Sequence, residues 1–232
     1  MATTAPNTTL TSDLLLLLWD DESGRPLAVS TKLEAVVAGA AVLDLLDSGA
    51  LEIENPTAKP KKQTLARVPG AALPSPEFEE IAEYAHGRTI KKAVGGAAGV
   101  NATRTRSKDL RRALLDKFVE SGLLQFEDSR ALGIFPWPRY RATYQGGYED
   151  ALRERLRGSL IEHRTPTLHE AGLLALLGTA KVTHKLFPHD DKKLVKRRAK
   201  EAIKDEALAG TPQLVLGAVQ SAIAAAAAAA SS

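Results

Sequence analysis

The chain has 232 residues, of which 44% are hydrophobic and 25% are charged, the composition of an ordinary globular protein. It contains no cysteine, which excludes disulfide bridges, thiolate nucleophiles and zinc–thiolate sites. The net charge of +3 is only mildly basic, and the abundance of Ala, Leu, Arg, Lys and Glu beside 5% aromatic residues favours helices over strands.

The first part of the chain is predicted as helix, hairpin and helix. Ser12 and Asp13 offer an N-cap for a helix that begins at Leu14. Apolar periodicity and turn residues then predict a helix at 32–46, strands at 50–54 and 63–68 that close a hairpin, and a helix at 74–85. The glycine-rich run 95–99 has no following Gly-Lys-Ser/Thr, so we expect a flexible turn there and no phosphate-binding loop.

The second part repeats a local pattern and then becomes helical. Residues 118–127 resemble residues 45–54, since each segment reads as a helix end, a Ser-Gly stop and a short strand. Residues 130–143 are rich in aromatic residues and proline and are predicted to form a hairpin. Further helices are predicted at 148–161, 169–185, 192–208 and 212–230. We expect a flexible N-terminus at 1–9 and, over 10–232, one mainly α domain: a compact helical bundle with short β-hairpins.

Basic residues gather in two runs. The first holds eight cations against one acid, and the second lies on a predicted helix near the C-terminus. The first run comprises Arg88, Lys91, Lys92, Arg104, Arg106, Lys108, Arg111 and Arg112. The second comprises Lys192, Lys193, Lys196, Arg197, Arg198, Lys200 and Lys204. Such runs are either solvated helix faces or surfaces for an anionic partner such as phospholipid, nucleic acid or phosphoprotein.

No motif of an enzyme is apparent. The nearest approach to a metal site is His184 and His189 with Asp190 and Asp191, and it lacks the spacing that places two ligands on one helical face. The chain has no Gly-x-Ser-x-Gly nucleophile turn. We therefore expect no catalytic residue, no metal and no cofactor.

Any membrane contact is expected to be peripheral. The strongest hydrophobic run, Leu14–Trp19, is far shorter than the about 20 residues that span a bilayer. Residues 1–9 carry no positive side chain before that run, which argues against a signal peptide. We expect a cytoplasmic protein that lies on a membrane surface.

The segment around Trp137 is a candidate surface loop. Pro136 and Pro138 exclude a helix or a central strand, so the aromatic rings are expected on a turn. Phe135 and Trp137 then either fold back onto the core or form an exposed apolar tip, which suits a membrane interface or a groove on a partner.

Three blocks, taken together with their order and spacing, resemble the Golgi phosphoprotein 3 family in a short form like those found in bacteria. The first contains LTSDLLLLL (10–18) and AGAAVLDL (38–45), the second contains FVESGLL (118–124) and leads into the hairpin at 134–136, and the third is LLALL (173–177) followed by the basic helix. The resemblance covers roughly residues 10 to 225 and implies one mainly helical domain. It also implies binding of phosphatidylinositol 4-phosphate at a membrane surface and an adaptor role toward client membrane proteins.

The resemblance also assigns site residues. The family holds the headgroup with one aromatic residue and three arginines, which fall here on Val29, Ala38, Arg111 and Ala113. Only Arg111 keeps the family's residue type, and Lys32 and Arg112 are the nearby candidates to supply displaced charge. The family's membrane-contacting hairpin falls on 132–140, so Leu132, Ile134, Phe135, Trp137 and Tyr140 are candidates for membrane contact or self-association.

The sequence is compatible with three functions. The leading hypothesis is a peripheral module that binds an anionic phospholipid, either phosphatidylinositol 4-phosphate or another acidic lipid. The alternative is a nucleic-acid-binding helical protein with winged-helix-like units, which is disfavoured because the apparent wings are apolar. The third is a protein–protein adaptor with no lipid function, in which Phe135 and Trp137 mediate self-association into a homo-oligomer.

Overall fold

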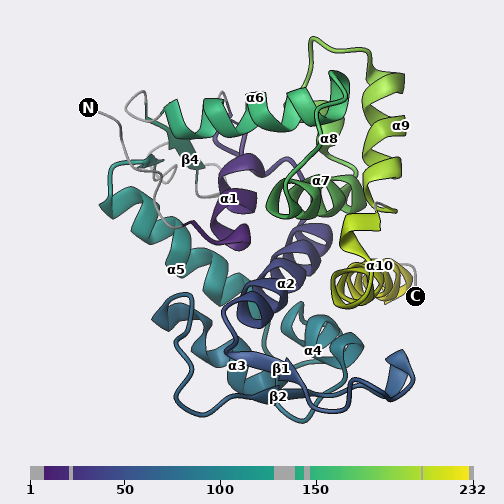
Figure 1. Ribbon diagram of the computed structural model, residues 1–232. Helices are drawn as coiled ribbons and strands as arrows, with labels where there is room; N and C mark the ends of the chain where they lie inside the picture. The colour runs from purple at the N-terminus through teal and green to yellow at the C-terminus, as the bar shows by residue number, and fades with distance from the viewer. Residues whose placement is uncertain (1–7, 21–22, 128–138, 144–146, 205, 230–232) are drawn as a thin grey trace.

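The fold is organised around one buried helix, α2 (Ser30–Asp47). The computed structural model describes residues 8–20, 23–127, 139–143, 147–204 and 206–229 (Figure 1). Every residue of α2 from Leu33 to Val42 is buried, as expected of a helix that is apolar on all sides. The helices that pack against it are α1 (Leu10–Leu17), α3 (Glu79–Ala85), α4 (Ile90–Ala97), α5 (Arg106–Glu120), α7 (Leu168–Ala180) and α10 (Thr211–Ala229).

The remaining helices form an outer layer on one side of this core. Helix α6 (Gly147–Ile161) and helix α9 (Lys192–Ala202) lie along the upper edge and the right edge of Figure 1, with α8 (Thr183–Leu186) packed on α9. Short 3-10 turns complete the described part of the chain: η1 (Pro60–Lys62), η2 (Pro76–Phe78) and η4 (Glu206–Leu208). The mainly helical fold predicted from the sequence is confirmed.

Two small antiparallel hairpins confirm the repeated pattern. Strand β1 (Leu51–Ile53) pairs with β2 (Leu65–Arg67), and β3 (Leu124–Glu127) pairs with β4 (Arg139–Ala142). In both copies a serine caps the preceding helix and a glycine with positive φ follows, 72° at Gly49 and 75° at Gly122. The tip of the second predicted hairpin, residues 128–138, lies outside the described residues, and with it lie Leu132, Ile134, Phe135 and Trp137.

The predicted start of the first helix at Leu14 is wrong by four residues. The side chain of Thr9 accepts the N–H of Ser12 and is the N-cap. The carboxylate of Asp44, at the end of α2, also accepts the N–H groups of Leu10 at 2.7 Å and Thr11 at 2.8 Å. Asp44, which is distant in sequence, therefore extends the helix toward the N-terminus. Local sequence patterns do not reveal this contact.

The interpretation of residues 95–99 as a flexible turn is also wrong, because α4 continues to Ala97. A Cβ atom at Gly96 would overlap the hydroxyl and ring of Tyr84. Glycine is therefore present in this helix because an aromatic ring from α3 lies directly against its backbone.

Three predicted helices are divided in the structure. The predicted helix 74–85 begins with the 3-10 turn η2, and the predicted helix 169–185 is interrupted at Lys181, whose φ is 62°. Helix α9 ends at Ala202 and not at Leu208.

One described helix, α10, is long and apolar enough to cross a membrane by length and composition. Its first half is instead part of the core, where it packs on α2 and α4 through Val215, Leu216, Ala218, Val219 and Ala222. These contacts join α10 to the folded domain.

The first turns of α1, α6 and α7 meet at a buried carboxylate, Asp13. The hydroxyl of Tyr148 donates to its two oxygens at 2.9 and 3.0 Å, and Nε2 of His169 lies 2.8 Å from Oδ2. The hydrogen bond with Asp13 raises the pKa of His169, and burial raises the pKa of the neighbouring Asp44 to about 6. Glu170 adds further negative charge beside the imidazole.

We expect this cluster to stabilise the fold more at about pH 6 than at about pH 8. A raised pKa of His169 in the folded state gives stability that is present below the unfolded-state pKa and is lost as pH rises through the folded-state pKa. Asp44 acts in the same direction, because the folded protein takes up its proton at a higher pH than the unfolded chain does. The measurement is the melting temperature of wild type minus that of His169→Gln at the two pH values.

His184→Gln is the matched control with the opposite sign. Burial, and then the charges of Lys196 and Lys192, lower the pKa of His184, so this histidine reduces stability as pH falls. A His169→Gln difference that is independent of pH would contradict the role given to the cluster.

Candidate functional site

Arg111 and Glu34 form a largely buried ion pair between α5 and α2. Arg111 donates from Nε at 3.1 Å and Nη2 at 2.8 Å to Oε1 of Glu34, and the hydroxyl of Ser107 donates to Oε2 at 2.9 Å. The side chains of Arg111 and Glu34 are 17% and 5% exposed. Both carboxylate oxygens thus have charged or polar donors, which a buried acid requires.

A row of aromatic rings continues from this ion pair to the second hairpin. The guanidinium carbon of Arg111 lies 5.9 Å from the ring centroid of Trp19. The ring of Trp19 meets that of Tyr140 edge-on at 6.0 Å, and Tyr140 lies 5.4 Å from Phe126 across the β3–β4 pair. Arg111 is therefore held in one place by an acid and an aromatic ring.

Tyr140 differs from the exposed role predicted for the hairpin, because it is only 6% exposed and packs on the core. Burial raises its pKa. Tyr140, at the base of the hairpin, is therefore anchored in the folded domain.

The other predicted headgroup positions are spread between surface and core. Val29 is the N-cap of α2 and is 65% exposed, whereas Ala38 lies inside the core with 0% exposed. Ala113 is half-buried on α5. Lys32 is half-buried and lies two residues before Glu34, so helix geometry places it on the other side of α2 from the ion pair. Ala38 lies one helical turn after Glu34, on the same face of α2 as the ion pair, but it is shielded from solvent.

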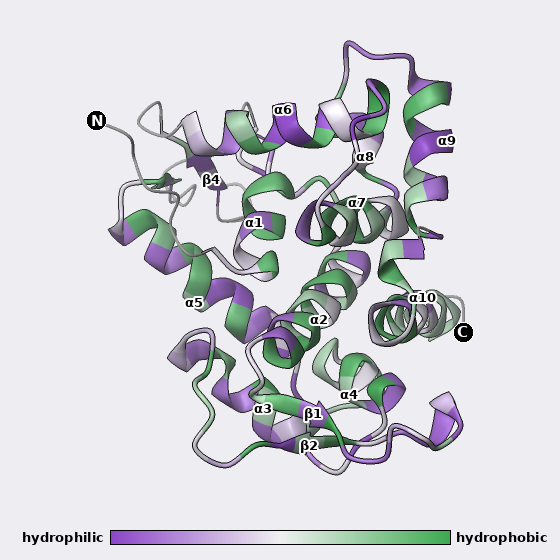
Figure 2. Ribbon diagram, in the orientation of Figure 1, coloured by the Kyte–Doolittle hydropathy of each residue, from purple (hydrophilic) through white to green (hydrophobic). Residues whose placement is uncertain are grey.

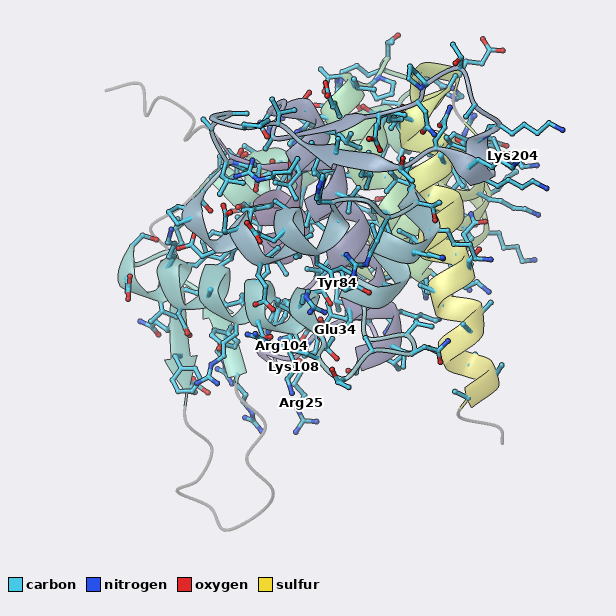
Figure 3. The ribbon with its side chains drawn as sticks, turned by 90° about the horizontal axis from the view of Figure 1, so that it is seen from below. Arg25, Glu34, Tyr84, Arg104, Lys108 and Lys204 are labelled. Carbon is cyan, nitrogen blue, oxygen red and sulfur yellow. The ribbon has the colours of Figure 1, made fainter. Side chains whose placement is uncertain are left out.

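Exposed cations do surround Arg111. Lys108 and Arg112 are exposed and lie one helical turn apart on α5, so they share a face. Arg25 is exposed on the turn between α1 and α2, and Figure 3 shows Arg25, Lys108 and Arg104 at the same edge of the molecule. We call Arg25, Lys108 and Arg112 the α5 basic face.

The turn that carries Arg25 is fixed to the second hairpin. Tyr140 donates its N–H to the carbonyl of Gly24 at 3.0 Å, and Trp19 forms a bridge with Pro26. The same tryptophan lies beneath the guanidinium of the buried ion pair. No sequence pattern indicated a role for Trp19, because its position beside Arg111 results from contacts between distant segments of the chain.

The cations of the α5 basic face are weakly compensated within the described part of the chain. Arg25 and Lys108 have no ion pair there, and Arg112 has only a 4.0 Å contact with Asp116 while its side chain is 81% exposed. A surface pair at that distance contributes little.

Three other cations of the first run are engaged, whereas Lys91 and Lys92 are exposed on α4. Arg88 and Arg106 lie 4.1 and 4.0 Å from the ring centroid of Tyr84. Arg104 pairs with Asp109 at 2.8 Å and with Glu80 at 2.9 Å. This part of the run therefore has a structural role, and only part of the predicted basic cluster projects into solvent.

The second basic run lies elsewhere. It occupies α9 and the residues after it, and Lys204 lies at the opposite edge of Figure 3 from Arg25. Among the described residues no group of three or more His, Asp or Glu side chains is placed to hold a metal ion.

The fold and this surface define a mainly helical, single-domain protein whose distinctive feature is a cationic face beside an aromatic-lined hairpin. The family model for Golgi phosphoprotein 3 (GPP34) matches residues 10–226, and the chain belongs to that family. No curated protein matches the chain.

Proposed function

We propose that the chain is a non-catalytic, peripheral membrane protein that binds anionic phospholipid headgroups through the α5 basic face. The observation that carries this proposal is the set of exposed, weakly compensated cations around a rigidly held arginine. Each Lys or Arg near an anionic membrane surface contributes about 1 kcal/mol of attraction. The α5 basic face therefore supports reversible binding, which the apolar hairpin would strengthen.

The proposal favours recognition of surface charge over recognition of one headgroup. Of the four family headgroup positions only Arg111 keeps its residue type, and two of its donors are directed at Glu34. We infer that phosphatidylserine and phosphatidylinositol 4-phosphate bind in proportion to the negative charge that they bring to the membrane surface.

An adaptor role, with a client membrane protein and location at the cytoplasmic face of a membrane, is part of the same proposal. It is supported by family membership. Self-association through the hairpin tip is a further proposal that concerns residues outside the described ones.

We expect Lys108→Glu with Arg112→Glu to weaken binding to anionic vesicles by about 30-fold or more, because two lost attractions of about 1 kcal/mol each equal about 2 kcal/mol. Binding should also weaken as salt rises, since exposed charges are screened beyond about 8–10 Å. Flotation with vesicles of phosphatidylcholine alone, or with phosphatidylserine or phosphatidylinositol 4-phosphate added at equal charge, measures both effects.

Lys61→Glu with Lys62→Glu is the matched control. Both lysines are exposed on η1, in the loop between β1 and β2, so the charge change is the same at a different place. Equal loss in the two variants would show that overall charge, and not the α5 basic face, attracts the membrane. Tighter binding to duplex DNA than to anionic vesicles would instead favour the nucleic-acid alternative.

A further inference from the structure

Helix α9 presents two different faces. Val195 and Ala199 are buried where α9 packs on α6, α7 and α8, and a Cβ atom at Gly178 of α7 would lie 2.7 Å from the carbonyl oxygen of Ala199. The backbone of α9 therefore sits tightly on α7. Hydrophilic bands alternate with hydrophobic ones along α9 in Figure 2, as this packing requires.

The outer face of α9 is a row of lysines. Lys192, Lys196 and Lys200 follow one another at four-residue spacing, about 6 Å apart along the helix, and Lys204 follows in the next turn of chain. All four are exposed. Lys193 and Arg197 form a second row beside them.

Two exposed acids flank these rows: Asp191 caps the start of α9, and Glu201 lies near its end. Within the described residues, Glu201 is the acid that forms ion pairs with cations of α9, at 3.2 Å from Arg198 and 3.9 Å from Arg197. The lysines of the row have no ion pair there. Burial first, and then the charges of Lys196 and Lys192, lower the pKa of His184, which lies beside this row.

The lysine row is separate from the α5 basic face. In Figure 1 helix α9 and helix α5 lie on opposite sides of the molecule, with α1, α2 and α7 between them. Figure 3, viewed from another direction, also places Lys204 far from Arg25 and Lys108. One bilayer in contact with the α5 basic face therefore leaves the row on α9 uncovered.

We propose that the outer face of α9 is a second docking surface for an anionic bilayer, so that one chain can bridge two membrane surfaces. The inference rests on the proposed function for the other surface. A cluster of four to eight basic residues on an amphipathic helix is typical of binding to anionic lipids. Lipid headgroups are mobile and can gather under a straight row of lysines without a shaped pocket.

Nucleic acid is a poorer match for this face. Base recognition uses Asn, Gln and Arg at base edges, and single strands stack on aromatic rings. Helix α9 contains no Asn, Gln or aromatic residue. Its two arginines, Arg197 and Arg198, lie against Glu201, so the exposed lysines of α9 favour attraction to a charged surface over recognition of a base sequence.

The test is vesicle clustering by the full chain, followed by light scattering, with flotation of the same samples. Wild type is expected to cluster vesicles of phosphatidylcholine and phosphatidylserine. Lys192→Glu with Lys196→Glu and Lys200→Glu should still float with the vesicles through the α5 basic face, but should lower the clustering rate by more than about tenfold, because three attractive charges of the second surface become repulsive. Glutamate is a good helix former, so α9 should remain folded, which circular dichroism checks.

A control with the same charge change is Lys59→Glu with Lys61→Glu and Lys62→Glu, in the loop that joins β1 and β2. That loop lies at the bottom of Figure 1, away from α9, and the three lysines are exposed. Clustering should persist in this variant.

The outcomes separate the two proposals. Absence of any vesicle binding by wild type would overturn the proposed function as well as this inference. Binding without clustering, or clustering that survives the α9 substitutions, would overturn the inference alone, the latter pointing to self-association. Loss of DNA binding upon the α9 substitutions, with clustering unchanged, would assign the face to nucleic acid.

Discussion

Replacing Arg111 with glutamine is expected to lower the free energy of unfolding by about 3 kcal/mol, because it leaves the carboxylate of Glu34 buried without its cation. The value lies at the lower end of the usual range for buried pairs, since Arg111 is itself partly exposed. Ser107 continues to donate to one oxygen of Glu34, but a single hydroxyl does not neutralise the charge.

The double variant Glu34→Gln with Arg111→Gln should recover most of this loss. Two neutral amides can hydrogen-bond to each other and to Ser107, and no buried charge remains. Denaturant unfolding of wild type, the single variant and the double variant measures the three free energies. An Arg111→Gln variant within about 0.5 kcal/mol of wild type would mean that the pair behaves as an ordinary surface contact.

A large loss of stability in Arg111→Gln would make this variant unsuitable as a test of membrane binding. Arg111 is the one family headgroup residue that the chain keeps, but its ion pair with Glu34 also joins α5 to α2. Loss of vesicle binding in an Arg111 variant would therefore mix loss of fold with loss of contact. Lys108 and Arg112 avoid this problem because both are exposed, and they are the more informative positions to change.

The sequence predicted the elements whose causes are local. The helix over 30–47 and the two copies of helix end, Ser-Gly stop and strand were predictable because periodicity and glycine stops act within a few residues. Helix α4 was not predicted, because glycine at position 96 leaves room for the ring of Tyr84, and that ring belongs to another helix. The start of α1 was misplaced because Asp44 caps it from the far end of α2.

The candidate surface was only partly predictable for the same reason. Arg111 was identified from the resemblance to a family, but its partner Glu34 is separated from it by 77 positions along the chain. Arg25 joins the surface only because the turn that carries it is bound to β4. Residue types and spacing indicated a basic surface, but contacts between helices decide which cations are free to meet a partner.

Gly39→Ala is expected to destabilise the fold, although alanine is the better helix former. In an open helix this change would stabilise by about 1 kcal/mol. At position 39 the added methyl group would overlap Cγ2 of Val219, where α10 crosses α2. Valine is rigid about χ1 and cannot rotate freely away, so overpacking costs about 1–3 kcal/mol and outweighs the gain in helix propensity.

Gly217→Ala on α10 is the matched control, because no atom lies within 4 Å of the Cβ that it would add. This variant should be more stable than wild type by up to about 1 kcal/mol. Adding Val219→Ala to Gly39→Ala removes the overlapping methyl groups, so the double variant should be more stable than the simple sum of the two single changes. Thermal or denaturant unfolding of the four variants gives these comparisons. If Gly39→Ala and Gly217→Ala shift stability in the same direction by the same amount, then α10 does not pack on α2 at Gly39, and the placement of this apolar helix within the folded domain is wrong.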